Sequence, residues 1–294
     1  MALPPPPHAS GPFARWSGLP WRPGGLRSGD GDKSPFYARG TGQRAALCFH
    51  GFTGTPFEVR PLAEALAAQG YTTLAPVLAG HGGTIDDLAA TTHTDWLASA
   101  ESALEALRTE TGGAPVLVAG FSLGGLLALR LARLHPESVA ALAVMAAPLR
   151  LSPLQVVGIR AIARLPRVLR RGLLHALPKS SGFDVVDQAM AALNPSLTAL
   201  PLAGVNSLLD LAALVRADLP HITTPILVAH GSHDRTVPIE DSLELIGTIG
   251  STTIERLWLE RSGHLLAIDV ERRTLIDAVL RFFAKVPAWP STRP

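Results

Sequence analysis

The stretch that decides the fold runs from Val118 to Pro136 and reads VAGFSLGGLLALRLARLHP. An apolar segment precedes its serine, and a run with helical spacing follows it. The serine stands between two glycines in GFSLG, residues 120–124, which is the G-x-S-x-G pattern of a nucleophile on a sharp strand-to-helix turn. Ser122 is therefore either a nucleophile or a small residue in a tight connection, and the rest of the chain has to separate the two.

Strands and helices are expected to alternate on both sides of this turn. Short apolar runs predict strands, and amphipathic runs between them predict helices. The predicted strands are 44–50, 71–78, 114–120, 138–147, 224–231 and 252–260, and the predicted helices are 55–70, 93–110, 123–134, 238–250 and 269–285. This order indicates an α/β fold with right-handed crossovers and a parallel sheet covered by helices on both faces.

Capping patterns mark the start of several predicted helices. Thr55 and Glu58 have the spacing of a capping box, in which each side chain binds the other residue's backbone N–H. Asp269 is the expected N-cap of the last helix. Ser207 and Asp210 carry a capping signature at the start of a helix between the two halves of the sheet.

The alternation stops between residues 148 and 221, where helical patterns occur without a convincing strand. We expect residues 35–147 and 222–294 to form the core, and residues 148–221 to form a small helical cap. The cap follows the carboxyl end of a strand, where open α/β sheets bind ligands. Residues 1–34 are a Pro/Gly-rich lead. Apolar side chains of the cap are expected to line a pocket for one aliphatic chain: Val156, Val157, Ile159, Ile162, Leu208, Leu211 and Leu214.

Composition excludes several other classes of protein. The formal net charge is only +2, and no Lys/Arg block indicates a nucleic-acid partner. The single cysteine, Cys48, excludes an intramolecular disulfide and lies in an apolar run, so it is expected to pack as a small hydrophobe. No apolar run approaches the ~18 residues of a membrane span, and the lead lacks the apolar core of a signal peptide. The expected location is cytoplasmic, and no His/Cys/Asp cluster has metal-ligand spacing.

A serine hydroxyl becomes a good nucleophile when a histidine takes its proton and a carboxylate holds the histidine. In hydrolases with such an elbow, the acid and then the histidine follow the serine in the chain. Asp234 directly follows one predicted strand, and His264 lies in the loop after the next, so both should reach the sheet edge that holds Ser122. His230 ends a strand and His233 would point away from Asp234, so neither is expected to be the base.

The reaction also needs hydrogen-bond donors for a developing oxyanion. One expected donor is the backbone N–H of Leu123, next after the serine. The other is the N–H of Phe52, in the turn HGFTG (residues 50–54) that follows the first predicted strand of the core. His81, in the Gly-rich turn AGHGG, is expected to be structural and not a ligand.

The motifs HGFTGTPFEVRPLAEALAAQGY, LAGHGG, TDW, AGFSLGG, GSHDRTVP and SGH occur in this order along the chain. Over residues 35–283 the sequence resembles the α/β-hydrolase fold, and within it the bacterial carboxylesterase and monoacylglycerol lipase group with a small helical cap. The resemblance implies a nucleophile, an acid, a base and two oxyanion donors that coincide with the residues assigned above: Ser122, Asp234, His264, Phe52 and Leu123.

The expected function is hydrolysis of carboxylic esters with short-to-medium acyl chains, through an acyl-enzyme and without a cofactor. Monoacylglycerols are plausible natural substrates, and the expected partner is a small-molecule ester. Three alternatives stay open. The same elbow serves peptidases, amidases, thioesterases and C–C hydrolases, and a non-catalytic binding protein could share the fold. The third is a protein that docks weakly on a membrane surface through arginines of the cap: Arg160, Arg164, Arg167 and Arg171.

Overall fold

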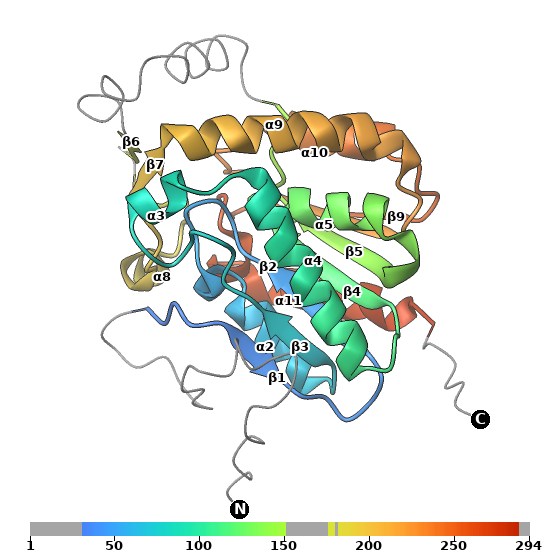
Figure 1. Cartoon of the computed structure of the whole chain (residues 1–294). Helices are drawn as coiled ribbons and strands as arrows, with labels where there is room; N and C mark the ends of the chain where they lie inside the picture. The colour runs from blue at the N-terminus through green and yellow to red at the C-terminus, as the bar shows by residue number, and fades with distance from the viewer. Residues whose placement is uncertain (1–30, 151–175, 180–181, 288–294) are drawn as a thin grey trace, which may run out of the picture.

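The computed structural model describes residues 31–150, 176–179 and 182–287. Seven strands in these residues form one sheet in the order β1-β3-β2-β4-β5-β8-β9 (Figure 1). All neighbouring pairs are parallel except β1 with β3 at one edge. The strands are β1 (Phe36–Ala38), β2 (Ala45–Phe49), β3 (Thr72–Ala75), β4 (Val116–Phe121), β5 (Val139–Met145), β8 (Ile226–Gly231) and β9 (Ile254–Leu259). The expected mostly parallel α/β sheet is confirmed.

Helices connect the strands and lie against both faces of the sheet. The α-helices are α2 (Arg60–Ala68), α3 (Ile85–Ala89), α4 (His93–Glu110), α5 (Leu123–Leu134), α8 (Gln188–Leu193), α9 (Leu202–Asp218), α10 (Ile239–Thr248) and α11 (Arg272–Lys285). Short 3-10 helices are η1 (Pro56–Glu58), η2 (Pro136–Ser138), η3 (Leu219–His221) and η4 (Leu266–Ile268). The helices predicted at 93–110 and 123–134 have the predicted bounds.

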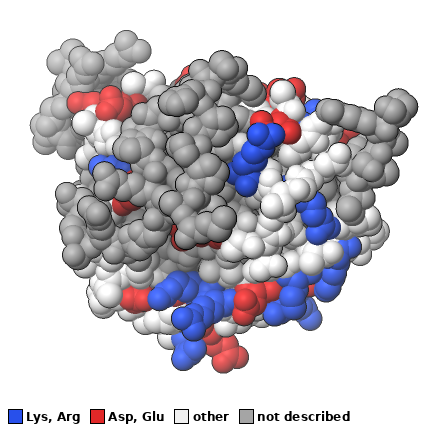
Figure 2. Space-filling model, turned by 90° about the horizontal axis from the view of Figure 1, so that it is seen from below, with Lys and Arg blue, Asp and Glu red and all other residues white. Residues whose placement is uncertain are grey.

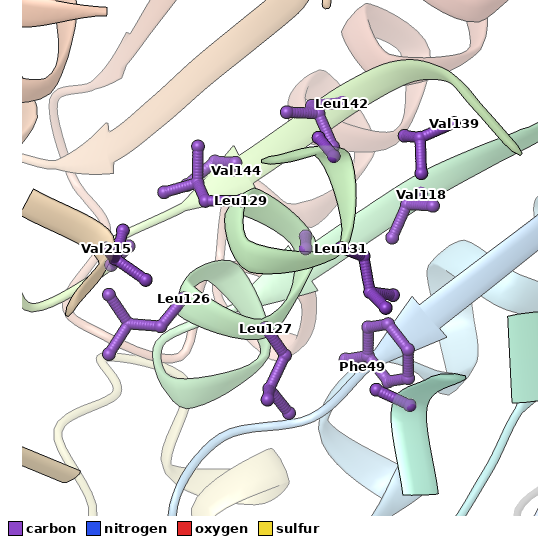
Figure 3. Close-up of a cluster of buried hydrophobic side chains, with 14 of the residues drawn as sticks. Phe49, Val118, Leu126, Leu127, Leu129, Leu131, Val139, Leu142, Val144 and Val215 are labelled. Carbon is purple, nitrogen blue, oxygen red and sulfur yellow. The ribbon is translucent and has the colours of Figure 1, made fainter. Parts of the chain in front are cut away.

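The core consists of two layers, because successive side chains of a strand point to opposite faces of the sheet. Leu47 of β2 and Val118 of β4 face one cluster, together with buried side chains of α4, α5, α9 and α10. Figure 3 shows part of this cluster, where Val118 lies among side chains of α5, β5 and α9. Cys48 and Ala119, one residue further along each strand, face the other cluster with α2 and α11. Cys48 is a buried free cysteine, as expected, and burial raises the pKa of its thiol to about 12.

The described part of the predicted cap differs from the expectation of helices alone. Two strands, β6 (Ala176–Pro178) and β7 (Ala199–Pro201), pair antiparallel, so the expectation of no strand there is wrong. Their three-residue length and their prolines hide them from a periodicity search. The elements β6, β7, α3 and α8 lie together on one side of the molecule (Figure 1).

The last helix of this segment, α9, belongs structurally to the core layer. Leu211 is fully buried in the cluster with α5, whereas Leu214 is 41% exposed. Leu211 therefore packs against the core and does not line a pocket above it. The other expected pocket residues at 156–162 and the four arginines lie outside the described residues, as does most of the lead.

Three predicted caps are wrong, because the side chains of Glu58, Asp269 and Ser207 bind backbone groups outside the predicted cap. The Thr55 side chain makes no capping bond, and Glu58 turns inward to the backbone N–H of Gly51. Helix α11 starts at Arg272, and Asp269 binds other backbone groups instead. Helix α9 starts at Leu202, five residues before Ser207.

The described surface carries mixed charge. On the face shown in Figure 2, the described Lys and Arg side chains lie next to Asp and Glu side chains along the lower rim. Among the described residues, no helix combines the length and the apolar character that a membrane crossing requires.

Candidate active site

Ser122 lies at the tip of the turn between β4 and α5, with φ 53° and ψ −116°. A non-glycine residue in such a conformation is strained and persists only where its surroundings hold it. Its N–H donates to the Met145 carbonyl at 2.8 Å, and its own carbonyl accepts from the Gly125 N–H at 2.9 Å. A Cβ atom on Gly124 would lie 2.4 Å from the Phe49 carbonyl oxygen. The glycine therefore lets helix α5 start close to β2 and keeps the turn sharp.

The structure brings Asp234 and His264 together from the loops after β8 and β9. His264 Nδ1 lies 2.7 Å from Asp234 Oδ2. The ring of Phe121, the residue before Ser122, lies 4.8 Å from the His264 ring between centroids. Because the carboxylate engages Nδ1, the other ring nitrogen of His264 is left for proton exchange. His264 and Asp234, the expected base and acid, thus lie together beside the elbow.

The Asp234 carboxylate is held in its ionised form. Burial alone would raise its pKa, but the nearby His264 and the hydrogen bonds of the carboxylate hold the pKa well below its usual range. Its Oδ1 accepts from the N–H groups of Thr236 and Val237, both at 2.8 Å. His230 Nε2 lies 3.3 Å from Oδ2, so this histidine touches the acid although it is not the expected base.

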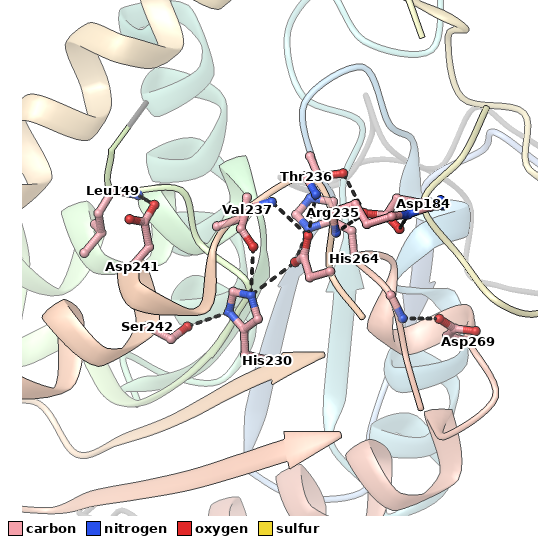
Figure 4. A network of polar contacts seen from close by, with 12 residues as sticks. Leu149, Asp184, His230, Arg235, Thr236, Val237, Asp241, Ser242, His264 and Asp269 are labelled. Atoms are coloured by element: carbon pink, nitrogen blue, oxygen red, sulfur yellow. Dashed lines mark hydrogen bonds and ion pairs between the residues drawn. The ribbon is translucent and has the colours of Figure 1, made fainter. Parts of the chain in front are cut away.

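Asp184, a residue of the segment predicted as a cap, joins the two loops. Its backbone carbonyl accepts from the N–H groups of His264 at 2.9 Å and Leu265 at 3.1 Å. Its carboxylate accepts from the Arg235 N–H at 2.7 Å and the Thr236 hydroxyl at 2.9 Å (Figure 4). One residue therefore holds the neighbours of both Asp234 and His264.

Asp269 adds a second link between the loop of His264 and the segment of Asp184. Its side chain is fully buried, and Oδ2 accepts from the Gly263 N–H at 2.7 Å. Oδ1 accepts from the N–H groups of Val186 and Asp187 at 2.9 Å each. The sequence pattern contains no signal for Asp184, and it assigned Asp269 to a helix cap, because most of these bonds join residues 51 to 83 positions apart.

Phe52 lies in a turn that is closed by its own backbone and by His50. The Gly51 carbonyl accepts from the Gly54 N–H at 3.1 Å and lies 3.0 Å from His50 Nδ1. Because a peptide unit is planar, a fixed Gly51 carbonyl also fixes the direction of the Phe52 N–H. Thr53 has a φ of 65°, which turns the chain back toward η1. Leu123, the other expected donor, is the first residue of α5, where backbone N–H groups have no intrahelical acceptor.

Two buried histidines lie beneath the turn of Phe52. Burial, and next the neighbouring His81, lowers the pKa of His50 to about 3. Burial lowers the pKa of His81 to about 4. The His81 ring contacts the rings of His50, Phe52 and Trp96 at centroid distances of 5.0, 6.3 and 5.9 Å. Both histidines are neutral near pH 7 and act as packed, polar supports.

The arrangement suits acyl transfer: a strained serine, an imidazole held by a carboxylate, and two backbone donors at the same sheet edge. Within residues 31–150, 176–179 and 182–287, no group of three or more His, Cys, Asp or Glu side chains could hold a metal ion. Two other histidines are not part of this arrangement. His135 Nε2 lies 2.8 Å from Glu101 Oε1, and the His233 side chain is exposed.

Comparisons with known proteins identify hydrolases as relatives of this chain. The family model described as serine aminopeptidase, S33, matches residues 42–271. A thermostable monoacylglycerol lipase of Bacillus sp. (strain H-257) is 35% identical over 251 residues, which are 85% of this chain and 94% of that protein. A carboxylesterase of Bacillus subtilis (strain 168) is 28% identical and covers 86% of this chain and 96% of its own length.

A solved structure described with LipS and LipT, two metagenome-derived lipolytic enzymes, superposes with a TM-score of 0.77 at 30% identity. It covers 86% of this chain and 98% of its own. The family match spans more than half of the sequence and includes the elbow and the segment of Asp234 and His264. The chain therefore belongs to the serine aminopeptidase S33 family of α/β hydrolases.

Proposed function

We propose that this chain is a serine esterase that hydrolyses carboxylic esters with short-to-medium acyl chains. The observation that carries the proposal is the 2.7 Å contact between His264 Nδ1 and Asp234 Oδ2 beside the elbow of Ser122. The names of the two Bacillus relatives support esters, monoacylglycerols among them, as the substrate class. The partner is a small-molecule ester, and no cofactor takes part. A cytoplasmic location and the division into core and cap stay predictions from the sequence.

In the proposed reaction, Ser122 Oγ attacks the ester carbonyl carbon while His264 Nε2 takes the hydroxyl proton. The carbonyl oxygen becomes an oxyanion, which the N–H groups of Phe52 and Leu123 stabilise. The bond to the alcohol then breaks, and the His264 imidazolium gives its proton to the departing oxygen. Water attacks the acyl-enzyme with the same histidine as base, which frees the carboxylic acid and the serine. Asp234 stays ionised and stabilises the imidazolium.

The decisive test is replacement of the nucleophile. Ser122→Ala and His264→Ala should each lower kcat on p-nitrophenyl butyrate by about 10⁶-fold, and the double variant should lose little more. A fluorophosphonate probe should label the parent protein and leave Ser122→Ala unlabelled. Ser232→Ala, on an exposed serine after β8, is the matched control and should keep full activity and labelling. Retention of more than a tenth of the activity by Ser122→Ala on every ester would overturn the assignment.

Substrate size is tested with monoesters of increasing acyl length. Each methylene buried in an apolar pocket contributes up to about 0.8 kcal/mol, so kcat/KM should rise about fourfold per methylene until the pocket is full. Emulsified triacylglycerol and an aminoacyl p-nitroanilide serve as comparisons. A higher rate on emulsified triacylglycerol would indicate an interfacial lipase, and a higher rate on the anilide would indicate the peptidase activity in the family's name.

A further inference from the structure

Glu58 is a buried carboxyl group that the proposed reaction does not use. The residue is 4% exposed, on the 3-10 helix η1. Oε2 accepts from the Gly51 N–H at 2.9 Å, and Oε1 lies 2.9 Å from the Ser196 hydroxyl oxygen. A buried carboxyl group costs free energy unless it is well hydrogen-bonded, so its partners indicate what it holds in place.

The first partner belongs to the turn that carries Phe52. The Glu58 carboxyl group lies against the inner side of this turn, because a Cβ atom on Gly54 would be 2.1 Å from Oε2. The Gly51 N–H and carbonyl are thus both engaged, the first by Glu58 and the second by His50 and the Gly54 N–H. With both ends of Gly51 fixed, the plane of the next peptide, which contains the Phe52 N–H, has little freedom to rotate.

The second partner belongs to the segment between β5 and β8. Ser196 contacts Glu58, and the Leu197 N–H donates to the Thr53 carbonyl at 3.0 Å. Lys179 Nζ lies 2.7 Å from Thr53 Oγ1, in the same turn. This segment therefore contacts the turn directly at two points, both on Thr53, and at a third point through Glu58, which binds the Gly51 N–H.

We propose that Glu58 is a positioning residue that keeps the Phe52 N–H aimed at the oxyanion and couples this turn to the segment of Ser196. The inference rests on the proposed esterase function. Glu58 acts by fixing the geometry of the turn, since it contacts the backbone of the turn and not the reacting atoms. The loss of one oxyanion donor typically lowers kcat by about 10²–10³-fold, which sets the upper limit of the effect.

The hydrogen-bond pattern also selects the conservative variant. The Ser196 hydroxyl has one proton but two acceptors, Asn194 Oδ1 at 2.7 Å and Glu58 Oε1 at 2.9 Å. A proton on Glu58 satisfies both contacts, and burial raises the pKa of this carboxyl group, although the Gly51 N–H and Lys179 oppose the shift. The neutral amide of Glu58→Gln can accept from Gly51 and donate to Ser196, so it should replace the carboxyl group.

The experiment compares Glu58→Ala, Glu58→Gln and Ser196→Ala by kcat, KM and affinity for a boronic acid that forms a tetrahedral adduct with Ser122. Glu58→Ala should lose about 30–100-fold in kcat and in boronate affinity at an unchanged KM. Glu58→Gln should stay within about threefold of the parent protein. Ser196→Ala should lose about fivefold in both quantities, and the double variant with Glu58→Ala should lose no more than Glu58→Ala alone.

Thr55→Val is the matched control, because the hydroxyl of Thr55 is buried in the same short helix cap and has no hydrogen-bond partner. It should leave kcat and boronate affinity unchanged. An equal loss in Thr55→Val and Glu58→Ala, or a loss of kcat without a loss of boronate affinity, would overturn the inference. If Glu58→Ala does not fold, an unaffected Ser196→Ala overturns it. A parent protein without esterase activity would instead refute the proposed function.

Discussion

The elbow at Ser122 and the loops of Asp234 and His264 are held in place by different means. The elbow is held by the central strands of the sheet: the Ser122 N–H donates to the Met145 carbonyl of β5, and Gly124 lies against the backbone of Phe49 at the end of β2. The two loops depend instead on the segment between β5 and β8: Asp184 contacts both loops, and Asp269 binds the loop of His264 to Val186 and Asp187. The nucleophile is positioned by the packing of helix α5 on the central strands, and its base by contacts to the segment between β5 and β8, so the two regions should fail differently when mutated.

The largest effect is expected at the elbow. Gly124→Ala would place a methyl group 2.4 Å from the Phe49 carbonyl oxygen, which is backbone and cannot rotate away. We expect a loss of about 3 kcal/mol in the free energy of unfolding and about 10²-fold or more in kcat, because α5 must move away from β2. Urea unfolding and ester hydrolysis measure both quantities.

Gly247 gives the matched control, since it lies in α10 and a Cβ atom there would meet nothing within 4 Å. Gly247→Ala should stabilise the protein by up to about 1 kcal/mol through helix propensity, without changing kcat. Equal behaviour of the two variants would show that the elbow tolerates a side chain, and that local packing does not position the serine.

The second effect concerns the buried carboxylate that joins the base loop to the inserted segment. Asp269→Asn replaces one carboxylate oxygen by an amide NH₂ group. This group would face either the Gly263 N–H, which now donates to Oδ2, or the N–H groups of Val186 and Asp187, which now donate to Oδ1. An unsatisfied buried donor costs about 1–3 kcal/mol, and we expect a loss of about 3 kcal/mol in unfolding free energy. The base loop should move with it, so kcat should fall about tenfold while fluorophosphonate labelling continues slowly. Fast labelling with an unchanged kcat would contradict this link.

The third effect separates the turn of Phe52 from the loop of Asp234 by pH. His50 and His81 have pKa values lowered to about 3 and 4 in the folded protein, so between pH 6.5 and pH 4 the unfolded chain binds more protons. The free energy of unfolding should therefore fall as the pH falls, by about 1.4 kcal/mol per pH unit for each histidine. Asp234, whose pKa is lowered, keeps its stabilising contribution above its ordinary pKa and loses it only in stronger acid.

Urea unfolding at pH 7, 6 and 5 measures this dependence. His81→Asn should be less stable than the parent protein at pH 7 but should have a shallower slope, by about one proton. Asp234→Asn should keep the parent slope in this window. If His81→Asn has the parent slope, the histidines beneath the turn of Phe52 are not the source of the acid sensitivity.

The sequence predicts the features that leave a local signal and misses those that depend on contacts between distant residues. The sheet, the elbow and the helices 93–110 and 123–134 follow from periodicity and from one local motif, and the Asp234–His264 contact follows from chain order. The three caps were misassigned because a Glu, Asp or Ser side chain can bind a distant backbone group as well as its own helix. The strands β6 and β7 are too short for a periodic signal, and nothing local marks Asp184.

The smallest effect is expected at Asp184, where the link between the loops is partly exposed and partly made by backbone. Its side chain is 12% exposed, and its carbonyl, which binds the His264 and Leu265 N–H groups, survives any substitution. Asp184→Ala removes the acceptor for the Arg235 N–H and the Thr236 hydroxyl, and the exposed ion pair with Arg235 Nε at 3.3 Å. We expect the free energy of unfolding to fall by about 1 kcal/mol and kcat to fall two- to fivefold, while KM stays unchanged.

Asp277→Ala, on the exposed side of α11, is the control for loss of one carboxylate and should change neither quantity. Asp184→Asn should recover most of the lost kcat, since one amide oxygen can still accept from the Arg235 N–H. If instead Asp184→Ala loses as much activity as Asp269→Asn, the acid loop depends on this carboxylate as strongly as the base loop depends on Asp269. The elbow would then differ from both loops to the same degree. The segment between β5 and β8 would be part of the catalytic scaffold, and Asp184 would be the residue that contributes most to holding the two loops.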